Sequence, residues 1–289
     1  MANSIAKFKK YVPLLDEVYK KEALTSDLDS DESLVQAGAN ANEIVIPKIS
    51  MDGLGDYSRN GGYTSGDVTF TNETVQFNYE RGRMFSVDAM DDEETAGLAY
   101  GKLASEFIRT KVAPEGDAFR FATYAGISGI GHATGTLSTG ADVIAALRAA
   151  TTAMDEAEVP AESRYLYITP TLKGLVEDLD TTKSREVFNR FAKVKEVPQT
   201  RFYTAIDLYD GSTSGEEAGG YVKASAGKDI NFMIIEKSAV LQYNKHIAPK
   251  VVTPEANPDA DAWKFGYRKY GLADVYENKV AGIYLHNKA

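Results

Sequence analysis

The sequence predicts an α+β protein in which an N-terminal arm and a long β loop project from a body with one long helix and an α/β domain. Three observations carry this prediction. Residues 43–86 alternate apolar and polar side chains around a glycine-rich tip, residues 96–107 carry a helical apolar stripe, and residues 139–240 alternate helix and strand patterns. Together they indicate four parts of different shape within one chain.

Composition limits the classes of protein that the chain can belong to. Its 289 residues are 43% hydrophobic and 26% charged, and no apolar stretch approaches the ~18 residues of a membrane span. The first 21 residues mix charged with apolar side chains, so we expect no secretory signal and a chain kept in the cytoplasm. The absence of cysteine excludes disulfides, thiol nucleophiles, iron–sulfur clusters and cysteine zinc sites. A net charge of −10 disfavours direct binding to DNA.

The first 42 residues are predicted to form an arm. From Ile5 to about Leu28 apolar residues recur at steps of three and four, which predicts an amphipathic helix with Pro13 as a kink. The stripe consists of Phe8, Tyr11, Val12, Leu15, Val18 and Tyr19. A polar linker follows. Since the arm has a single apolar stripe, it needs another surface on which to rest.

Residues 43–86 are predicted to be an extended β loop. The β-branched residues of 43–51 indicate a strand, in which Pro47 marks an edge position. A glycine-rich tip comes next, and from residue 75 apolar and polar side chains alternate again as far as Phe85. The loop is too polar at its tip to form a core, so we expect it to project.

A peripheral domain is predicted from residues 87–138 and 241–289, built on a long spine helix. Ala96, Tyr100, Leu103 and Phe107 give the helix one apolar face. Acids gather at its start and bases at its end, which the helix dipole favours without any catalytic role. Pro114 is expected to interrupt or kink this helix.

An apical domain of α/β type is predicted for residues 139–240. Thr139 and Asp142 suit a capping box at the start of its first helix. The apolar runs at 164–169 and 231–236 indicate buried strands.

No catalytic, cofactor-binding or metal-binding residues are predicted. His132, His246 and His286 stand apart without partners at the spacing of metal ligands. The glycines at 129–135 miss the dinucleotide-binding spacing and follow no strand, and the acids at 27–31 lack the glycine and the final glutamate of a calcium loop. We therefore expect no cofactor and no enzyme activity.

Five stretches resemble the major capsid proteins of tailed bacteriophages, whose fold is shared by encapsulin shells and the herpesvirus capsid floor. They are AKFKKYVPLLDEVYKKEALTSDL, EIVIPKI, TFTNETVQFNYERGRMFSVDAMDDEE, SRYLYITPTLKGLVEDL and AWKFGYRKYGLADVYENKVAGIYLHNK. In chain order they are similar to the arm, the extended loop leading to the spine helix, the apical domain and the closing strands of the peripheral domain. The resemblance covers nearly the whole chain.

The resemblance implies a phage major-capsid fold and a shell protein that assembles with itself into pentamers and hexamers around double-stranded DNA, without sequence-specific DNA binding and without a membrane. Portal, scaffold and decoration proteins are the further partners that it implies. The stretch before residue 43 leaves no room for a fused scaffold, so a separate scaffold, or none, is expected. The implied location is the virion capsid, assembled in the host bacterial cytoplasm. An encapsulin-like compartment and a soluble α/β enzyme stay open as alternatives.

Candidate inter-subunit residues lie on the extended loop and at the start of the spine helix. We predict that Tyr57, Arg59 and Tyr63 at the loop tip contact a neighbouring subunit. Arg81 and Arg83 share a strand face and are predicted to pair with acids of an adjacent subunit, although pairing within their own chain is equally open. These acids are Asp91, Asp92, Glu93 and Glu94.

Overall fold

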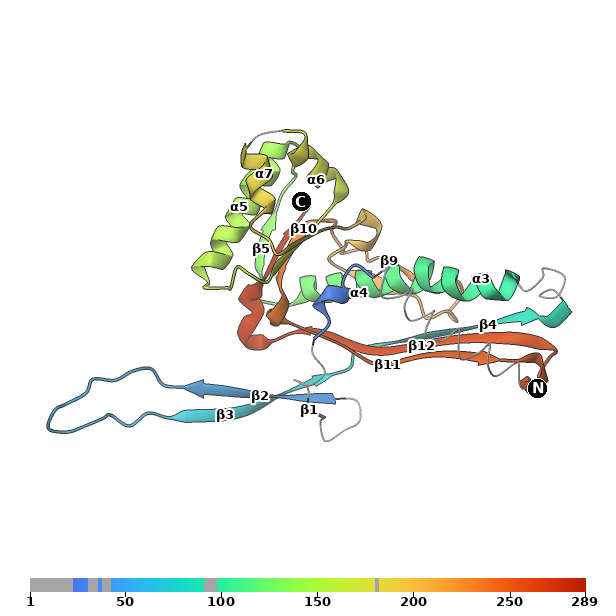
Figure 1. Cartoon of the computed structure of the whole chain (residues 1–289), viewed down its shortest axis with the longest axis horizontal. Coiled ribbons are helices and arrows are strands. Elements are labelled where there is room, and N and C mark those ends of the chain that lie inside the picture. The colour runs from blue at the N-terminus through green and yellow to red at the C-terminus, as the bar shows by residue number, and fades with distance from the viewer. Residues whose placement is uncertain (1–22, 31–35, 38–42, 91–97, 180–181) are drawn as a thin grey trace.

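The computed structural model describes residues 23–30, 36–37, 43–90, 98–179 and 182–289. A long two-stranded hairpin extends from one side of the body, and a long helix runs above a sheet of long strands on the other side (Figure 1). A wedge of helices and strands rises from the middle.

The predicted helix over residues 5–28 does not reach residue 28, because Ser26–Leu28 form a single 3-10 turn. Residues 5–22 of that prediction lie outside the described residues.

The projecting hairpin consists of β2 (Glu43–Met51) and β3 (Val68–Gln76), which pair antiparallel from Glu43 opposite Gln76 to Met51 opposite Val68. The short β1 (Gln36–Ala37) pairs with β2 only at Ile44 and Val45. Pro47 lies beyond the two residue pairs that the structure describes between β1 and β2, so its missing N–H disrupts neither of them.

Residues 79–88 belong to the body and not to the projecting loop. They form β4 (Tyr79–Asp88), which pairs with β12 (Ala262–Val275), and β12 pairs in turn with β11 (Val240–Val252). The predicted loop boundary at residue 86 thus falls inside β4. Between hairpin and sheet, the Asn78 side chain donates to the Ala273 carbonyl at 2.8 Å and accepts from the Ala273 N–H at 3.1 Å. The Asn78 side chain therefore replaces the backbone hydrogen bonds of a neighbouring strand at the point where the chain passes from the hairpin to the peripheral sheet.

The spine helix is continuous through Pro114. It runs through α3 (Leu98–Phe107), a π-helical turn (Ile108–Val112) and α4 (Ala113–Gly126), with Pro114 in the first turn of α4. Proline has no N–H and its ring crowds the carbonyl four residues before it, so an α-helix would lose a bond and clash there. The wider π-helical turn just before Pro114 accommodates the ring without ending the helix.

The apical wedge is a five-stranded sheet in the order β5-β13-β10-β6-β7. Its strands are β5 (Gly131–Thr134), β6 (Arg164–Ile168), β7 (Lys193–Glu196), β10 (Ile230–Glu236) and β13 (Ile283–Asn287). β5 and β13 come from stretches that were predicted to be peripheral. β10 is buried along its whole length and therefore needs a neighbour on each side, and β13 returns from the end of the chain to supply one.

Helices cover both faces of the apical sheet. One face packs on α5 (Gly140–Glu156), α6 (Pro170–Glu177) and α7 (Thr182–Phe188), and Thr139 with Asp142 forms the predicted capping box of α5. The other face packs on α4 through Phe121 and Tyr124. A small hairpin of β8 (Ile206–Leu208) and β9 (Tyr221–Lys223) carries the loop 209–220 toward the spine helix.

A buried polar network ties the anchor segment, residues 23–30, to the spine helix. The fully buried Asp117 carboxylate accepts from the Leu24 N–H at 3.0 Å, and from the Thr25 N–H at 3.1 Å and hydroxyl at 2.7 Å. Arg201 of the apical part reaches the same carboxylate at 3.3 Å. One side chain of α4 therefore joins the entering chain to the apical wedge.

Asp117→Asn tests this junction. The substitution removes the charge that faces Arg201 and leaves one oxygen where two accept, so we expect the free energy of unfolding to fall by roughly 2–4 kcal/mol. Urea denaturation of the unassembled chain measures it. Glu106→Gln, in an exposed pair with Arg109 on the same helix, should leave the midpoint almost unchanged. Equal midpoints for the two variants would contradict the assignment.

Candidate interaction surfaces

Strand register divides the hairpin into a polar and an apolar face. Ile49 lies opposite Phe70 and Met51 lies opposite Val68, and alternate residues of a strand point to the same side. The apolar face, defined here as Pro47, Ile49, Met51, Val68 and Phe70, is therefore continuous across both strands. The other face carries Lys48, Ser50, Thr69, Thr71 and Glu73.

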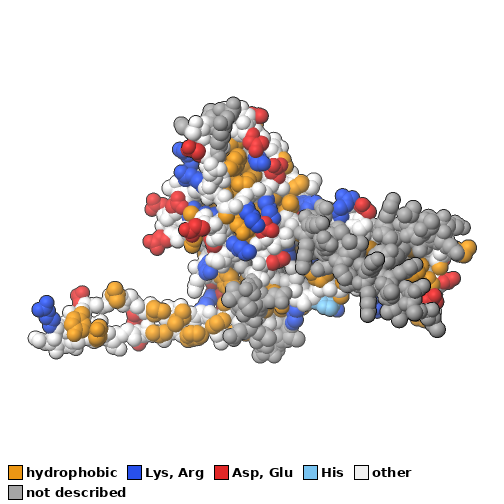
Figure 2. Space-filling model, in the orientation of Figure 1, with side chains coloured by type: hydrophobic (Ala, Val, Ile, Leu, Met, Phe, Trp, Pro, Cys, Tyr) orange, Lys and Arg blue, Asp and Glu red, His pale blue; other side chains and the backbone are white. Residues whose placement is uncertain are grey.

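The apolar face is exposed in the single chain. The exposed fractions are 53% for Ile49, 64% for Met51, 66% for Val68 and 69% for Phe70. Figure 2 shows hydrophobic side chains in an almost unbroken row along the projecting hairpin. Contiguous apolar surface of this kind marks an interaction site in a folded protein.

The polar face is turned toward the body. At the hairpin root Ile44 and Val75 are buried against Leu241 and Leu272 of the peripheral sheet. Further out on the same face, Lys48 pairs with Glu73 of β3 at 2.8 Å and also with Glu277 of the body. Glu277 and Glu73 raise the pKa of the Lys48 ammonium by holding its charged form. Among the residues that the structure describes, the apolar face consequently points away from the body.

The hairpin tip brings together the three residues predicted there. The rings of Tyr57 and Tyr63 meet edge to face with centroids 4.9 Å apart, across a turn closed by backbone bonds between Ser58 and Gly62. Gly62 has a φ of 77°, which favours glycine, and Arg59 lies exposed within the turn. The tip offers an aromatic pair and a cation on a fixed turn.

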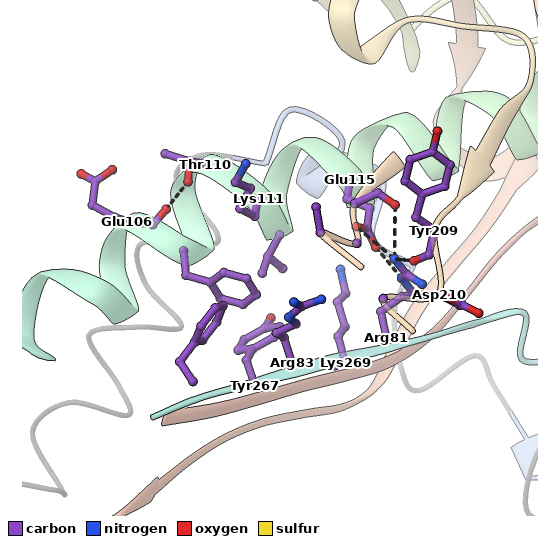
Figure 3. A pocket seen from close by; sticks show the side chains of 18 of the residues that line it. Arg81, Arg83, Glu106, Thr110, Lys111, Glu115, Tyr209, Asp210, Tyr267 and Lys269 are labelled. Carbon is purple, nitrogen blue, oxygen red and sulfur yellow. Dashed lines mark hydrogen bonds and ion pairs between the residues drawn. The ribbon is translucent and has the colours of Figure 1, made fainter. Parts of the chain in front are cut away.

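Arg81 and Arg83 contact residues of their own chain, and these partners differ from the acids at 91–94 that the sequence analysis named. Arg81 pairs with Glu115 of α4 at 2.8 Å and donates to the Tyr209 carbonyl at 2.7 Å (Figure 3). Arg83 donates to the Glu217 carbonyl at 3.0 Å. The acids 91–94 lie outside the described residues, so their pairing with a neighbouring subunit stays a prediction.

These arginines line one side of a cavity of about 450 Å³, here called the spine pocket, between the spine helix, the peripheral sheet and the loop 209–220 (Figure 3). Phe85 and Phe107 also line it, with their rings in edge-to-face contact at 4.8 Å. Lys269 rises from the sheet into the cavity, and burial lowers the pKa of its ammonium. The cavity therefore combines an aromatic pair with charged side chains, which include Glu106 and Lys111 of the spine helix.

Nothing in the described residues indicates metal chemistry or a membrane span. In residues 23–30, 36–37, 43–90, 98–179 and 182–289, no three side chains of His, Cys, Asp or Glu gather where they could hold a metal ion. Within the same ranges, no helix combines the length and apolar character needed to cross a membrane.

The sequence prediction missed the apolar face itself. Val68 and Phe70 alternate with threonines, which predicts a strand but not which side of it is covered. The signal lies in the register: once Ile49 is placed opposite Phe70, the apolar residues of both strands fall on one side. A hairpin alignment across the glycine-rich tip would have found it.

Comparison by sequence finds no match among protein-family models or curated proteins. Comparison of structures finds similar chains from phage particles. A chain of Mycobacterium phage Che8 is 14% identical with a TM-score of 0.62, covering 91% of this chain and 90% of that one. The capsid structure of cyanophage P-SCSP1u is 14% identical with a TM-score of 0.60, covering 92% and 88%.

A virus-like particle from Pyrococcus furiosus is also similar, at 8% identity and a TM-score of 0.56, covering 96% of this chain and 99% of that one. All three matches extend over almost the full length of both chains. The chain therefore has the α+β fold of phage capsid subunits, and the predicted fold is confirmed.

Replacement of Arg81 tests the tie between β4 and the loop 209–220. Arg81→Met removes the donors to the Tyr209 and Gly220 carbonyls, so the loop should open more often. We expect a glutamate-specific protease to cleave after Glu216 and Glu217 several-fold faster than in the unaltered chain. Arg109→Met, at an exposed pair, should leave the rate unchanged; an unchanged rate in both variants would show that Arg81 does not hold the loop.

Proposed function

We propose that this chain is the major capsid protein of a tailed phage, which assembles with itself into an icosahedral shell around double-stranded DNA. The fold supports the proposal, because the chain matches phage capsid chains over nearly its whole length. In this proposal the chain forms pentamers and hexamers in the host bacterial cytoplasm and ends in the virion. It has no catalytic role.

The single observation that carries the proposal is the exposed apolar face of the hairpin. A face that includes Ile49 and Phe70 is turned away from its own body, so another molecule has to cover it. A second copy is the simplest partner, because each copy then both offers a hairpin and receives one. Closed symmetry repeats the contact around a ring, and interfaces that are weak singly add up to a stable shell.

Charge is consistent with a wall that encloses DNA. At a net charge of −10 the subunit has no general affinity for phosphate, so the genome is held by enclosure and not by sequence-specific contacts. We extend the proposal to portal, scaffold and decoration proteins as partners of the shell.

A shell that packages protein in place of a genome is the second candidate. The likeness to the virus-like particle from Pyrococcus furiosus, which spans 96% of this chain, favours it specifically. The contents of purified particles decide between the two: nuclease-protected DNA of one length supports the phage shell, and a co-purifying protein supports the compartment.

Two substitutions at adjacent residues of β3, one on each face of the hairpin, test the role of the apolar face in assembly. Phe70→Asp places a charge on the apolar face, where burial against a neighbour would have to desolvate it, and we expect the particle yield to fall about tenfold or more. Thr71→Asp puts the same charge one residue away on the polar face and should assemble normally. Negative-stain microscopy and sedimentation count the particles.

Two outcomes would contradict the proposal. If the unaltered chain forms no particles at high concentration, either alone or together with its scaffold, it is not a shell protein. If particles form but Phe70→Asp and Thr71→Asp assemble equally well, the shell stands and the apolar face is not its contact.

A further inference from the structure

The anchor segment leaves the body at the wall of the spine pocket. Ala23 is buried at 4% exposure and belongs to the apolar cluster of Ile108, Val112 and Tyr267. Val112 and Tyr267 also line the pocket. The point at which residues 1–22 join the described chain therefore lies at the pocket, and the bonds from Asp117 to Leu24 and Thr25 fix that point.

The pocket offers an apolar surface that the described residues leave partly exposed. Phe85, Leu103 and Phe107 line it and are only half-buried, although all three pack on the same cluster as Ala23. The projecting hairpin of the same chain extends to the opposite side of the body from α3 (Figure 1), so it cannot reach this surface.

The N-terminal residues suit this surface in pattern and in length. Phe8, Tyr11 and Leu15 belong to the single apolar stripe of the predicted amphipathic helix. A helix over residues 5–22 would be about 27 Å long at 1.5 Å per residue, and residues 98–112 of the spine helix extend for about 22 Å on the same scale. Even with the predicted kink at Pro13, the segment is thus long enough to lie along the spine helix over the whole pocket.

We propose that residues 1–22 bind the spine pocket of their own chain, with the stripe of Phe8, Tyr11 and Leu15 packed against Phe85, Leu103 and Phe107. The tether at Ala23 gives the segment an effective concentration in the millimolar range, which a second copy in dilute solution does not match. The contact is independent of shell assembly, because both partners lie within one chain.

Cysteine crosslinking tests the contact, and the introduced cysteines are the only thiols that can react because the chain has no cysteine of its own. Glu106→Cys lies on the exposed rim of the pocket and is combined in the full-length chain with Tyr11→Cys on the stripe. The matched control combines it with Lys10→Cys, which is adjacent in sequence and lies on the opposite side of the predicted helix. A short bismaleimide is added to dilute, unassembled chains, and products are identified by electrophoresis and peptide mass spectrometry.

We expect the Tyr11→Cys pair to form an intrachain product about tenfold faster than the Lys10→Cys pair, since both thiols have the same tether and differ only in facing the pocket. Adding Leu15→Asp to the first pair should lower its rate to that of the control, and adding Glu17→Gln should not. Equal rates for the two pairs would overturn the proposal. Products formed only between chains would also overturn it and would place the segment on a second copy, whether or not particles form under assembly conditions.

Discussion

The two strands of the hairpin, β2 and β3, cannot cover their own apolar face. The contacts between the hairpin and the body follow from that constraint. Residues 43–76 leave the body as two strands, and an isolated pair of strands is at best marginally stable in water. The polar face is fastened at its root by buried Ile44 and Val75 and further out by the Lys48 ion pairs. What the described residues leave uncovered is one row of apolar side chains, which we propose that another copy buries.

The body is built to hold the root of that ribbon in place. Asn78 replaces a ladder partner where the chain passes from the hairpin into β4, and Arg81 then fixes β4 to Glu115 of the spine helix. From α4, Asp117 reaches both the anchor segment and the apical wedge. Buried polar groups of this kind are strongly destabilising when a partner is lost, so they specify one arrangement of the parts.

Sequence patterns predicted the local features and missed those that depend on distant pairing. The strands at 43–51 and 164–168, the spine helix and the capping box at Thr139 all follow from short-range periodicity or capping chemistry. Pro114 was predicted to interrupt or kink the helix, and the π-helical turn that accommodates it was not predicted because it has no simple sequence signal. The return of β13 to the apical sheet joins residues far apart in the chain, which periodicity cannot reveal.

Hydrogen exchange at the backbone amides of residues 43–76, compared between free subunits and assembled particles, tests the central claim most directly. If the apolar face is covered only by another copy, these amides exchange rapidly in free subunits and at least about tenfold more slowly in particles, while those of β10 are protected in both. Equal protection of the hairpin in free and assembled chains would contradict the account, because it would show that the hairpin is already covered by its own body.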